Sequence, residues 1–391
     1  MTTVPERIEE LSEEFTALAE EADALGRTPD TAVKLLRDSG VVRMLQSRDF
    51  GGLETSPVDF FESVMRIGAR SGSIGWVAGV VGVHPFELGQ ADRRVQEEIW
   101  GEDPDTWVAS PYAPMGRARA VEGGYRFSGR WSFSSGTDAC DWIVLGGLFA
   151  DEEGKPIPGT SERHFILPRA DYEIVPDSWN VIGLKGTGSK DIVIRDAFVP
   201  GYRVVDPGEL ESGEAARKAG REDSDLYRMP FHAMFGTVIA AGTLALADGA
   251  LAAYLAYTRS RVTARGVTMA TDQAALSTLA AATADIEAGR VQFVHDVQRM
   301  WDIAQSGRRI PIELRAAARS NQVQAVRRSH AAVDSLMAAA GGGAMRTDLP
   351  LQRFWRDMSI ARNHAANSGE STAINSGLLT FGQPLRPGTR L

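Results

Sequence analysis

The histidines are the first residues of this chain whose type could do chemistry. Six are present, and none lies at a metal-ligand spacing from another His, Asp or Glu, so we expect no metal site. His84 interrupts an otherwise apolar run, and His364 follows an Arg-Asp pair near the C-terminus. An imidazole can take up or release a proton near neutral pH, yet a buried histidine is more often a hydrogen-bonded core residue. On the residues alone, both interpretations stay open.

A serine-rich turn is the second such feature. Residues 131–136 read WSFSSG, and their periodicity predicts a strand end whose hydroxyls satisfy backbone groups. No G-x-S-x-G nucleophile elbow is present, which argues against a serine hydrolase. The single cysteine, Cys140, excludes an internal disulfide framework and a Cys-based zinc cluster, and it fits a reducing cytoplasm. We interpret it as a structural thiol.

A glycine-rich segment, residues 183–189 (GLKGTGS), is the third feature. It lies between two β-like segments, so it is either a turn that needs positive φ angles or a ligand-binding loop. No G-x-G-x-x-G fingerprint follows a strand and opens a helix, and no Walker A sequence is present. We therefore expect that this chain does not bind a nicotinamide cofactor.

The elements that must position these residues begin with helices. Apolar residues recur at steps of three and four from Ile8 to Leu25, which predicts one amphipathic helix. Thr3 and Glu6 form a plausible capping box, and Gly26 is a natural end. Further helices are expected after Pro29 and over residues 57–69, 74–88 and 91–100. The run 74–88 contains His84 and reads as a buried helix.

Alternation of apolar and polar residues begins near Trp107 and predicts strands. Residues 125–131 and the pair Ile192 and Ile194 alternate, whereas 143–149 and 165–167 are apolar enough to be buried strands. The polar stretch 206–225 reads as a loop or excursion. We expect a β-domain over residues 106–225, after an N-terminal helical domain over 1–105.

Long alanine-rich segments dominate the rest of the chain, residues 226–391. They predict helices over 235–261, 274–304 and 312–340, and a final helix over 351–366 that would carry His364. Such helices bury more than one face and commonly pack as a bundle. Part of that burial is expected against another subunit.

The bulk composition bounds the class of protein. The apolar fraction of 43% and the charged fraction of 24% are ordinary for a globular protein. A net charge of −9 disfavours nucleic acid or an anionic membrane as a partner. The N-terminus lacks a signal peptide, and no segment reads as the roughly 20 apolar residues that span a bilayer. We expect a cytoplasmic protein without a membrane partner.

The order of helices, β-domain and helical bundle resembles the acyl-CoA dehydrogenase fold, a mainly α architecture with a central β-barrel or sandwich and a C-terminal four-helix bundle. Within that superfamily the chain looks most like the flavin-dependent monooxygenases that hydroxylate 4-hydroxyphenylacetate and the steroid-catabolism intermediate 3-HSA. The matching words are Trp76-Val77, Val81 to His84, Trp100 to Pro104, Ser110 to Gly116, Gly123 to Tyr125, Trp131 to Gly136, Gly183 to Ser189, and Arg353 to Asp357. They cover most of the chain.

The resemblance implies a role for each matching position. Ser135 looks like the serine that bonds flavin N5 and preserves a C4a-hydroperoxyflavin. His84 and Ser110 resemble the pair at the substrate phenol, where a histidine can accept the phenolic proton. His364 resembles the second catalytic histidine. The expected flavin contacts are Trp131, Ser134, Ser135, Gly136, Gly186, Thr187, Gly188 and Ser189.

Three departures from the relatives qualify the resemblance. The glutamate base of medium-chain-type dehydrogenases would stand at 357 + 8 = 365, which is Ala365 here, so dehydrogenation is disfavoured. Ala366 and Ser368 replace a tyrosine and an aspartate of the two hydroxylases named above. Both changes affect substrate selection and leave the flavin chemistry in place.

The sequence therefore predicts the oxygenase component of a two-component flavin monooxygenase. It would use reduced FMN or FAD, delivered by a separate NAD(P)H:flavin reductase, and O2 to hydroxylate a small aromatic, phenolic substrate. A homotetramer is implied by the resemblance. The alternatives are a monooxygenase of the same fold that acts on nitrogen, sulfur or an indole-like ring, an acyl-CoA dehydrogenase, and a silent flavin-binding protein.

Overall fold

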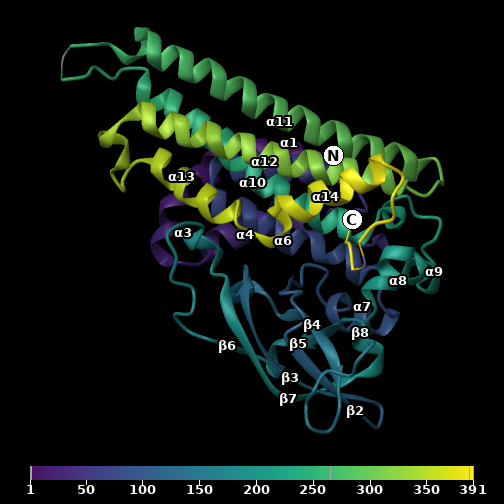
Figure 1. Cartoon of the computed structure of the whole chain (residues 1–391). Coiled ribbons are helices and arrows are strands. Elements are labelled where there is room, and N and C mark those ends of the chain that lie inside the picture. Colours follow the sequence, from purple (N-terminus) through teal and green to yellow (C-terminus); the bar gives the residue numbers. More distant parts are fainter. Residues whose placement is uncertain (1, 265, 387, 391) are drawn as a thin grey trace.

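Helices from both ends of the chain form one layer, and the strands lie together beneath them (Figure 1). The computed structural model describes residues 2–264, 266–386 and 388–390. The element order is helices, strands, then helices again, as the periodicity predicts. The two helical parts share one core, because α5 and α6 from the N-terminal part pack against α10 from the C-terminal part.

The first predicted helix is wrong in one respect, because it is divided into three. It consists of α1 (Val4–Glu10), α2 (Ser12–Ala17) and α3 (Ala19–Leu25), with breaks at Leu11 and Leu18. The breaks are seven residues apart, and an unbroken α-helix would turn such a repeat away from the core by about 20° per heptad. Breaking the helix keeps the apolar stripe buried. The capping box at Thr3 and the left-handed end at Gly26 are confirmed.

The remaining N-terminal helices agree with the sequence to within a few residues, and α6 is the one that matters for the site. It is buried almost throughout, which matches an apolar composition on every face. The helices are α4 (Asp30–Ser39), α5 (Pro57–Arg70), α6 (Gly72–Leu88) and α7 (Arg93–Trp100).

The strands form one mixed sheet with the order β6-β7-β3-β2-β4-β5-β8, and β1 pairs with β4 off this path. The long antiparallel pair β3 and β7 has a register shift between Trp131 and Ser134, where the serine-rich turn begins. The strands are β1 (Val108–Ala109), β2 (Gly116–Val121), β3 (Gly124–Ser134), β4 (Trp142–Ala150), β5 (Arg163–Pro168), β6 (Glu173–Ile174), β7 (Lys190–Pro200) and β8 (Val204–Val205).

The polar stretch after β8 is not the loop that the sequence suggested. It contains two short helices, α8 (Pro207–Ser212) and α9 (Glu214–Lys218). Its glutamate, alanine, arginine and lysine residues are good helix formers, and this local propensity outweighs the polar composition.

The C-terminal helices pack as a bundle in which α11 lies outermost and α12 lies between it and the rest (Figure 1). Two expectations fail here: the helix after Pro350 ends at Ala361, before His364, and a further helix follows it. The helices are α10 (Phe231–Thr258), α11 (Gln273–Gln305), α12 (Ile312–Ala340), α13 (Pro350–Ala361) and α14 (Gly369–Thr380).

One described helix, α10, is long and apolar enough to cross a membrane by length and composition. The expectation that no segment would reach this length was wrong, because alanine and glycine raise the mean hydropathy of α10 without a run of large side chains. In the structure 78% of the most apolar 18-residue stretch of α10 is buried, which is typical of a core helix.

Candidate active site

His84 lies on α6 and is almost fully buried. Its Nδ1 lies 2.5 Å from the carbonyl oxygen of Val108, and because a carbonyl can only accept, Nδ1 carries the hydrogen. In the neutral ring Nε2 is then an acceptor, and the hydroxyl of Ser110 donates to it at 2.7 Å. Burial lowers the pKa of His84 to about 4, so the ring is neutral at neutral pH. The pair presents a proton acceptor.

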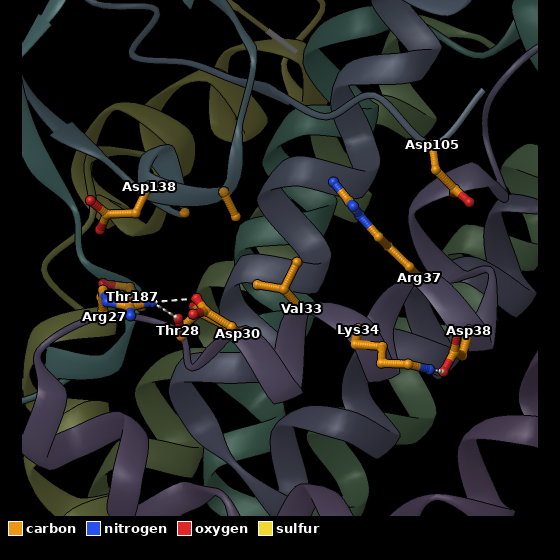
Figure 2. Close-up of a pocket in the computed structure, with 12 residues that line it drawn as sticks. Arg27, Thr28, Asp30, Val33, Lys34, Arg37, Asp38, Asp105, Asp138 and Thr187 are labelled. Carbon is orange, nitrogen blue, oxygen red and sulfur yellow. Dashed lines mark hydrogen bonds and ion pairs between the residues drawn. The ribbon is translucent and has the colours of Figure 1, made fainter. Parts of the chain in front are cut away.

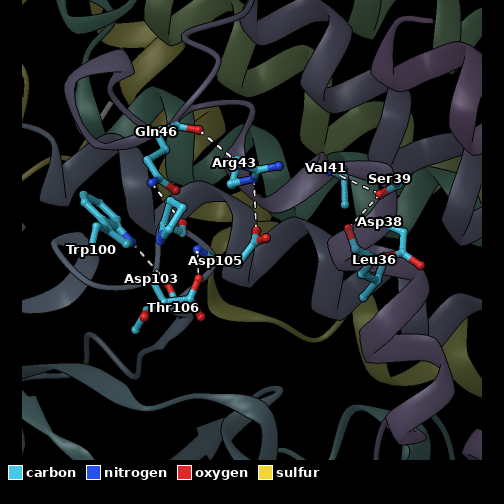
Figure 3. Close-up of polar contacts among 12 residues, drawn as sticks. Leu36, Asp38, Ser39, Val41, Arg43, Gln46, Trp100, Asp103, Asp105 and Thr106 are labelled. Carbon is cyan, nitrogen blue, oxygen red and sulfur yellow. Dashed lines mark hydrogen bonds and ion pairs between the residues drawn. The ribbon is translucent and has the colours of Figure 1, made fainter.

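The position of Val108 is fixed by hydrogen bonds and an ion pair of the loop after α7 (Figure 3). The Trp100 indole N–H donates to the carbonyl of Thr106 at 3.1 Å, and the Gln46 amide donates to the carbonyl of Pro104 at 3.1 Å. The Arg43 guanidinium lies 3.0 Å from the carboxylate of Asp105. These bonds tie the start of β1 to the N-terminal helices and so set the position of the acceptor that holds His84.

His364 lies at the N-cap of a single 3-10 turn, Ala365–Asn367, instead of inside the predicted last helix. Its Nδ1 accepts from the backbone N–H of Ala366 at 3.1 Å, so in the neutral ring the hydrogen is on Nε2. Burial and the nearby Arg319 lower the pKa of His364 to about 4. Neutral His364 is therefore a hydrogen-bond donor at Nε2, the opposite of His84.

A run of aromatic rings connects the two histidines. His364 lies 6.4 Å from Phe235, Phe235 lies 5.0 Å from Tyr112, and Tyr112 lies 5.8 Å from His84, measured between ring centroids. Trp76 flanks His364 at 5.9 Å. The structure thus brings His84, Ser110 and His364 to the two ends of one aromatic cluster.

Sequence reasoning missed three members of this aromatic cluster. Tyr112 and Trp76 stand inside words quoted above for the family resemblance, so that resemblance was the available signal. Phe235 had no such signal, because it is one apolar residue among many on α10. Its place beside His364 depends on how α10 packs against the segment after α13.

The serine-rich turn has a strained backbone. Phe133 has a φ of 70°, which is unfavourable for a residue with a side chain, and its ring is 68% exposed. Gly136 closes the turn at φ 71°, and the Cys140 thiol donates to its carbonyl at 3.3 Å. The Ser134 hydroxyl is buried and finds no hydrogen-bond partner among the described residues. Strain and an unsatisfied hydroxyl are typical of a ligand-binding segment.

The glycine-rich segment is joined to that turn by hydroxyls. Ser189 Oγ lies 2.7 Å from both Ser135 Oγ and Thr187 Oγ1, and the backbone N–H of Gly136 donates to the carbonyl of Thr187 at 2.8 Å. Leu184 also adopts a positive φ, 50°. The two turns are therefore one unit, which the sequence did not indicate from the residues alone.

Two of the predicted flavin-contact glycines are explained by packing. A Cβ on Gly186 would lie 2.7 Å from the Cβ of Ala22 on α3, and one on Gly188 would lie 2.9 Å from the Asp138 carboxylate. Their missing side chains let the turn approach the N-terminal helices. The Trp131 side chain points into the protein interior, where its indole N–H donates to the carbonyls of Ala113 and Gly146.

The joined turns rest on the helix that carries His84. A Cβ on Gly136 would lie 2.9 Å from Val77 and 3.1 Å from Val81, both on α6. Buried hydroxyls, left-handed backbone and neighbouring aromatic rings form a surface that fits the polar edge and planar ring of a flavin. The residues present therefore suit the cofactor that the resemblance implies.

A cleft of about 490 Å³ lies where the turns meet α4 (Figure 2). Gly136 and Thr187 line it, together with charged side chains that are largely paired, such as Arg27 with Asp30 at 2.7 Å. In the described part of the chain, its lining includes none of His84, Ser110 and His364. The cleft is thus separate from the aromatic cluster. Within residues 2–264, 266–386 and 388–390, no group of three or more His, Cys, Asp or Glu side chains could hold a metal ion.

Comparison with known proteins decides the family. Residues 237–369 match the acyl-CoA dehydrogenase, C-terminal domain. The chain is 46% identical over 362 residues to a pigment production hydroxylase of Rhodococcus erythropolis, covering 93% of this chain and 92% of that protein. It is 40% identical over 379 residues to HsaA, the oxygenase subunit of a flavin-dependent monooxygenase of Mycobacterium tuberculosis, covering 96% and 95%. The chain belongs to the flavin-dependent monooxygenases.

Solved structures agree with this family. A crystal structure of 3-HSA hydroxylase from Rhodococcus sp. RHA1 matches with a TM-score of 0.92 at 36% identity, covering 98% of this chain and 97% of that one. XiaF from Streptomyces sp., in complex with FADH2 and glycerol, matches with a TM-score of 0.91 at 26% identity, covering 99% and 97%. The predicted fold is confirmed.

The monooxygenase is the oxygenase component of a two-component system, as the sequence predicts, and it hydroxylates an aromatic compound with reduced flavin and O2. A separate flavin reductase supplies the reduced cofactor. The dehydrogenase and the silent flavin-binding alternatives are thereby set aside, in agreement with the alanine at position 365.

Proposed function

We propose that the monooxygenase hydroxylates a phenol at the carbon next to its hydroxyl group, with His84 and Ser110 at the phenolic oxygen and His364 at the other end of the aromatic cluster. The observation that supports this most is the pair of opposite tautomers. His84 offers an acceptor at Nε2, and His364 offers a donor at Nε2. The acceptor at His84 can receive the proton that a phenol loses when it becomes an electron-rich phenolate. The donor at His364 can stabilise negative charge on a reacting oxygen group.

The proton step follows from the bond between Ser110 and His84. The Ser110 hydroxyl donates to Nε2, so the lone pairs of its oxygen are available to a phenolic O–H. The phenol gives its proton to Ser110 Oγ while Ser110 gives its own to Nε2. The products are a phenolate, whose ortho carbon is a better nucleophile, and an imidazolium at His84.

The cofactor site is proposed at the joined turns. Ser134, Ser135 and Ser189 would hold the flavin through their hydroxyls, and the backbone of Gly136 and of residues 186–188 would form the wall beside it. Trp131 would act by anchoring the turn from inside the β-domain. When bound, reduced flavin activates O2 for transfer of one oxygen atom. Either FMN or FAD fits this proposal.

The aromatic cluster has a second use in this proposal, which is to keep water out. Tyr112 and Phe235 lie between the two imidazoles, and Trp76 flanks His364. Water at the reacting centre promotes loss of peroxide before oxygen transfer, so a dry pocket favours product.

Relatives of similar identity are named for phenolic and for indole substrates, so the choice between them rests on the site. The chain is 31% identical to a p-hydroxyphenylacetate 3-hydroxylase oxygenase component of Acinetobacter baumannii and 29% identical to a resorcinol hydroxylase oxygenase component of a Rhizobium species. It is also 30% identical to an indole-3-acetate monooxygenase of Pseudomonas putida. An indole carries no acidic hydroxyl, so the pair of His84 and Ser110 favours the phenols.

We also propose a cytoplasmic homotetramer built from three domains, residues 1–105, 106–225 and 226–391. Exposed apolar side chains on α11 and near the C-terminus support subunit contacts, among them Leu276, Val291 and Phe381. Sedimentation velocity measures the assembly directly, and a monomer at micromolar concentration contradicts this part.

The substrate proposal is tested with matched pairs of phenols and their methyl ethers. The protein is mixed with reduced flavin and oxygenated buffer, and organic product and hydrogen peroxide are both measured. We expect ortho-hydroxylated product from a phenol, and peroxide alone from the methyl ether, which has no proton to give. Equal product from both members of a pair contradicts the role of proton removal.

A further inference from the structure

The Glu87 carboxylate on α6 is fully buried, and the chemistry proposed above does not use it. It lies one helical turn after His84, and residues three apart on a helix are neighbours on one face. An ionised carboxylate in such a place is costly unless hydrogen bonds and opposite charge compensate it. Its neighbours therefore indicate what it does.

Two side chains from the β-domain hold this carboxylate. The Tyr112 hydroxyl donates to one oxygen of Glu87 at 2.7 Å, and Nδ1 of His164 lies 2.6 Å from the other. His164 comes from β5, whereas Tyr112 comes from the loop after β1. Both oxygens of Glu87 therefore have a partner, which offsets part of the cost of burying this side chain.

This cluster is in contact with His84. The Tyr112 ring packs edge-on against His84 at 5.8 Å and lies 4.6 Å from the ring of His164. Burial lowers the pKa of His84 to about 4; the hydrogen bond to the Val108 carbonyl and then the negative charge of Glu87 raise this pKa, and His164 lowers it. The titratable groups that face the cluster are Tyr112, His164 and, from α10, His232.

When His84 is protonated at Nε2, the carbonyl of Val108 that contacts its Nδ1 cannot take up the positive charge. Nδ1 donates to the carbonyl of Val108, and a backbone carbonyl neither takes a proton nor carries a compensating full charge. A buried imidazolium without a counter-charge is strongly disfavoured. The carboxylate on the same face of α6 provides that counter-charge.

We infer that Glu87 is a positioning residue whose buried carboxylate stabilises the positive charge that His84 acquires when it takes the proton of a phenolic substrate. The inference rests on the proposed function. The O–H bond of the phenol breaks, an N–H bond forms at Nε2 through Ser110, and the pair His84 and Glu87 becomes an ion pair. Tyr112 and His164 hold the carboxylate in place through its two oxygens.

The test is the ionisation of a bound chromophoric phenol. The full chain is saturated with reduced flavin under anaerobic conditions, 4-nitrophenol is added, and its phenolate absorbance is titrated with pH. We expect Glu87→Gln to raise the apparent pKa of bound 4-nitrophenol by about one unit, a tenfold loss of proton transfer. Tyr112→Phe keeps the charge and should shift the titration much less. A packing role alone would make the two variants equal.

Controls separate this inference from the proposed function. Glu98→Gln is the matched control, because Glu98 also accepts from a tyrosine hydroxyl, that of Tyr202, but on α7. If His84→Gln shifts the titration and folded Glu87→Gln does not, the inference fails and the proposed function stands. If His84→Gln also leaves it unchanged, the proposed function fails. Should Glu87→Gln not fold, Glu87→Asp should give a smaller shift in the same direction, and no shift contradicts the inference.

Discussion

The joined turns and the region of His84 and His364 are two parts of one site that use different chemical groups. The turns use left-handed backbone, hydroxyls and close packing, and they lie at the end of β3 and just before β7. The histidines come from α6 and from the segment after α13; His84 is held by Val108 of the β-domain, whereas His364 is held by Ala366 of its own turn. The first region is rigid and carries hydroxyls, whereas the second is buried, aromatic and titratable.

This difference teaches how binding and proton transfer are divided. A planar cofactor that arrives from another protein needs a fixed surface that does not change with pH, and hydroxyls and backbone supply it. Removing a proton needs a group whose protonation state can change, and burial tunes such groups. We therefore expect changes in the histidine region to affect chemistry most, and changes in the turns to affect cofactor handling and stability.

The largest effect is expected from His84→Ala. Loss of the proton acceptor should lower the rate of product formation by about 100-fold or more, while flavin oxidation continues and yields hydrogen peroxide. Product and peroxide are measured together after mixing with reduced flavin and oxygen. His295→Ala is the control, because His295 is exposed on α11. Unchanged product formation in His84→Ala would move the acceptor role to another residue.

A tenfold effect is expected in the turns from Ser135→Ala. The variant loses the hydroxyl that meets Ser189, a contribution of about one hydrogen bond, which corresponds to roughly tenfold in rate. Peroxide release without substrate should accelerate by that factor, with little change in fold. Ser132→Ala is the control, since Ser132 belongs to the same turn but is exposed. Equal release rates in the two variants would exclude Ser135 from the cofactor contact.

The two regions also differ in how much of them the sequence predicts. The serine-rich and glycine-rich words are local, so the turns could be located from the sequence, although the bonds of Ser189 that join them could not. His84 could be placed on a buried helix. His364 was assigned to a helix that ends three residues earlier, because an apolar pattern does not mark where the last turn stops.

What sequence could not supply is the set of partners that gives each histidine its role. Val108, Phe235 and Glu87 are distant from one another in sequence or carry no distinctive motif, and only the packing of α6, α10 and the β-domain brings them together. The short helices α8 and α9 were missed as well, because their polar composition shows no apolar periodicity.

A pH-dependent effect is expected at Asp357, which links the bundle to the glycine-rich turn. Its carboxylate accepts from the backbone N–H of Leu184 at 2.5 Å, and burial raises its pKa from 3.8 to about 7. Because the folded pKa is above the unfolded one, the folded protein holds the extra proton, and the stability gained is lost as pH rises through about 7.

Asp357→Asn removes that titration and can keep the bond to Leu184. The difference in melting temperature, variant minus native protein, should increase by about 2 to 4 °C from acidic to mildly alkaline buffer. Asp285→Asn, at an exposed position on α11, is the control. A constant difference in melting temperature across this range contradicts a protonated Asp357 in the folded state.

The smallest effect is expected from Gly188→Ala, and it tests whether the turns are rigid because of packing or because of backbone angle. Gly188 has a φ of 54°, and a Cβ there would lie 2.9 Å from the Asp138 carboxylate and 3.2 Å from the Cβ of Arg27. Gly213 has a φ of 78° with nothing within 4 Å of such a Cβ, so Gly213→Ala measures the backbone strain alone, about 1 kcal/mol. Gly188→Ala should cost about 1 kcal/mol more in chemical denaturation, and it should also weaken flavin binding. If the two variants lose equal stability, close packing against Arg27 and Asp138 does not hold the turn, and the rigidity of the cofactor side comes from its left-handed backbone.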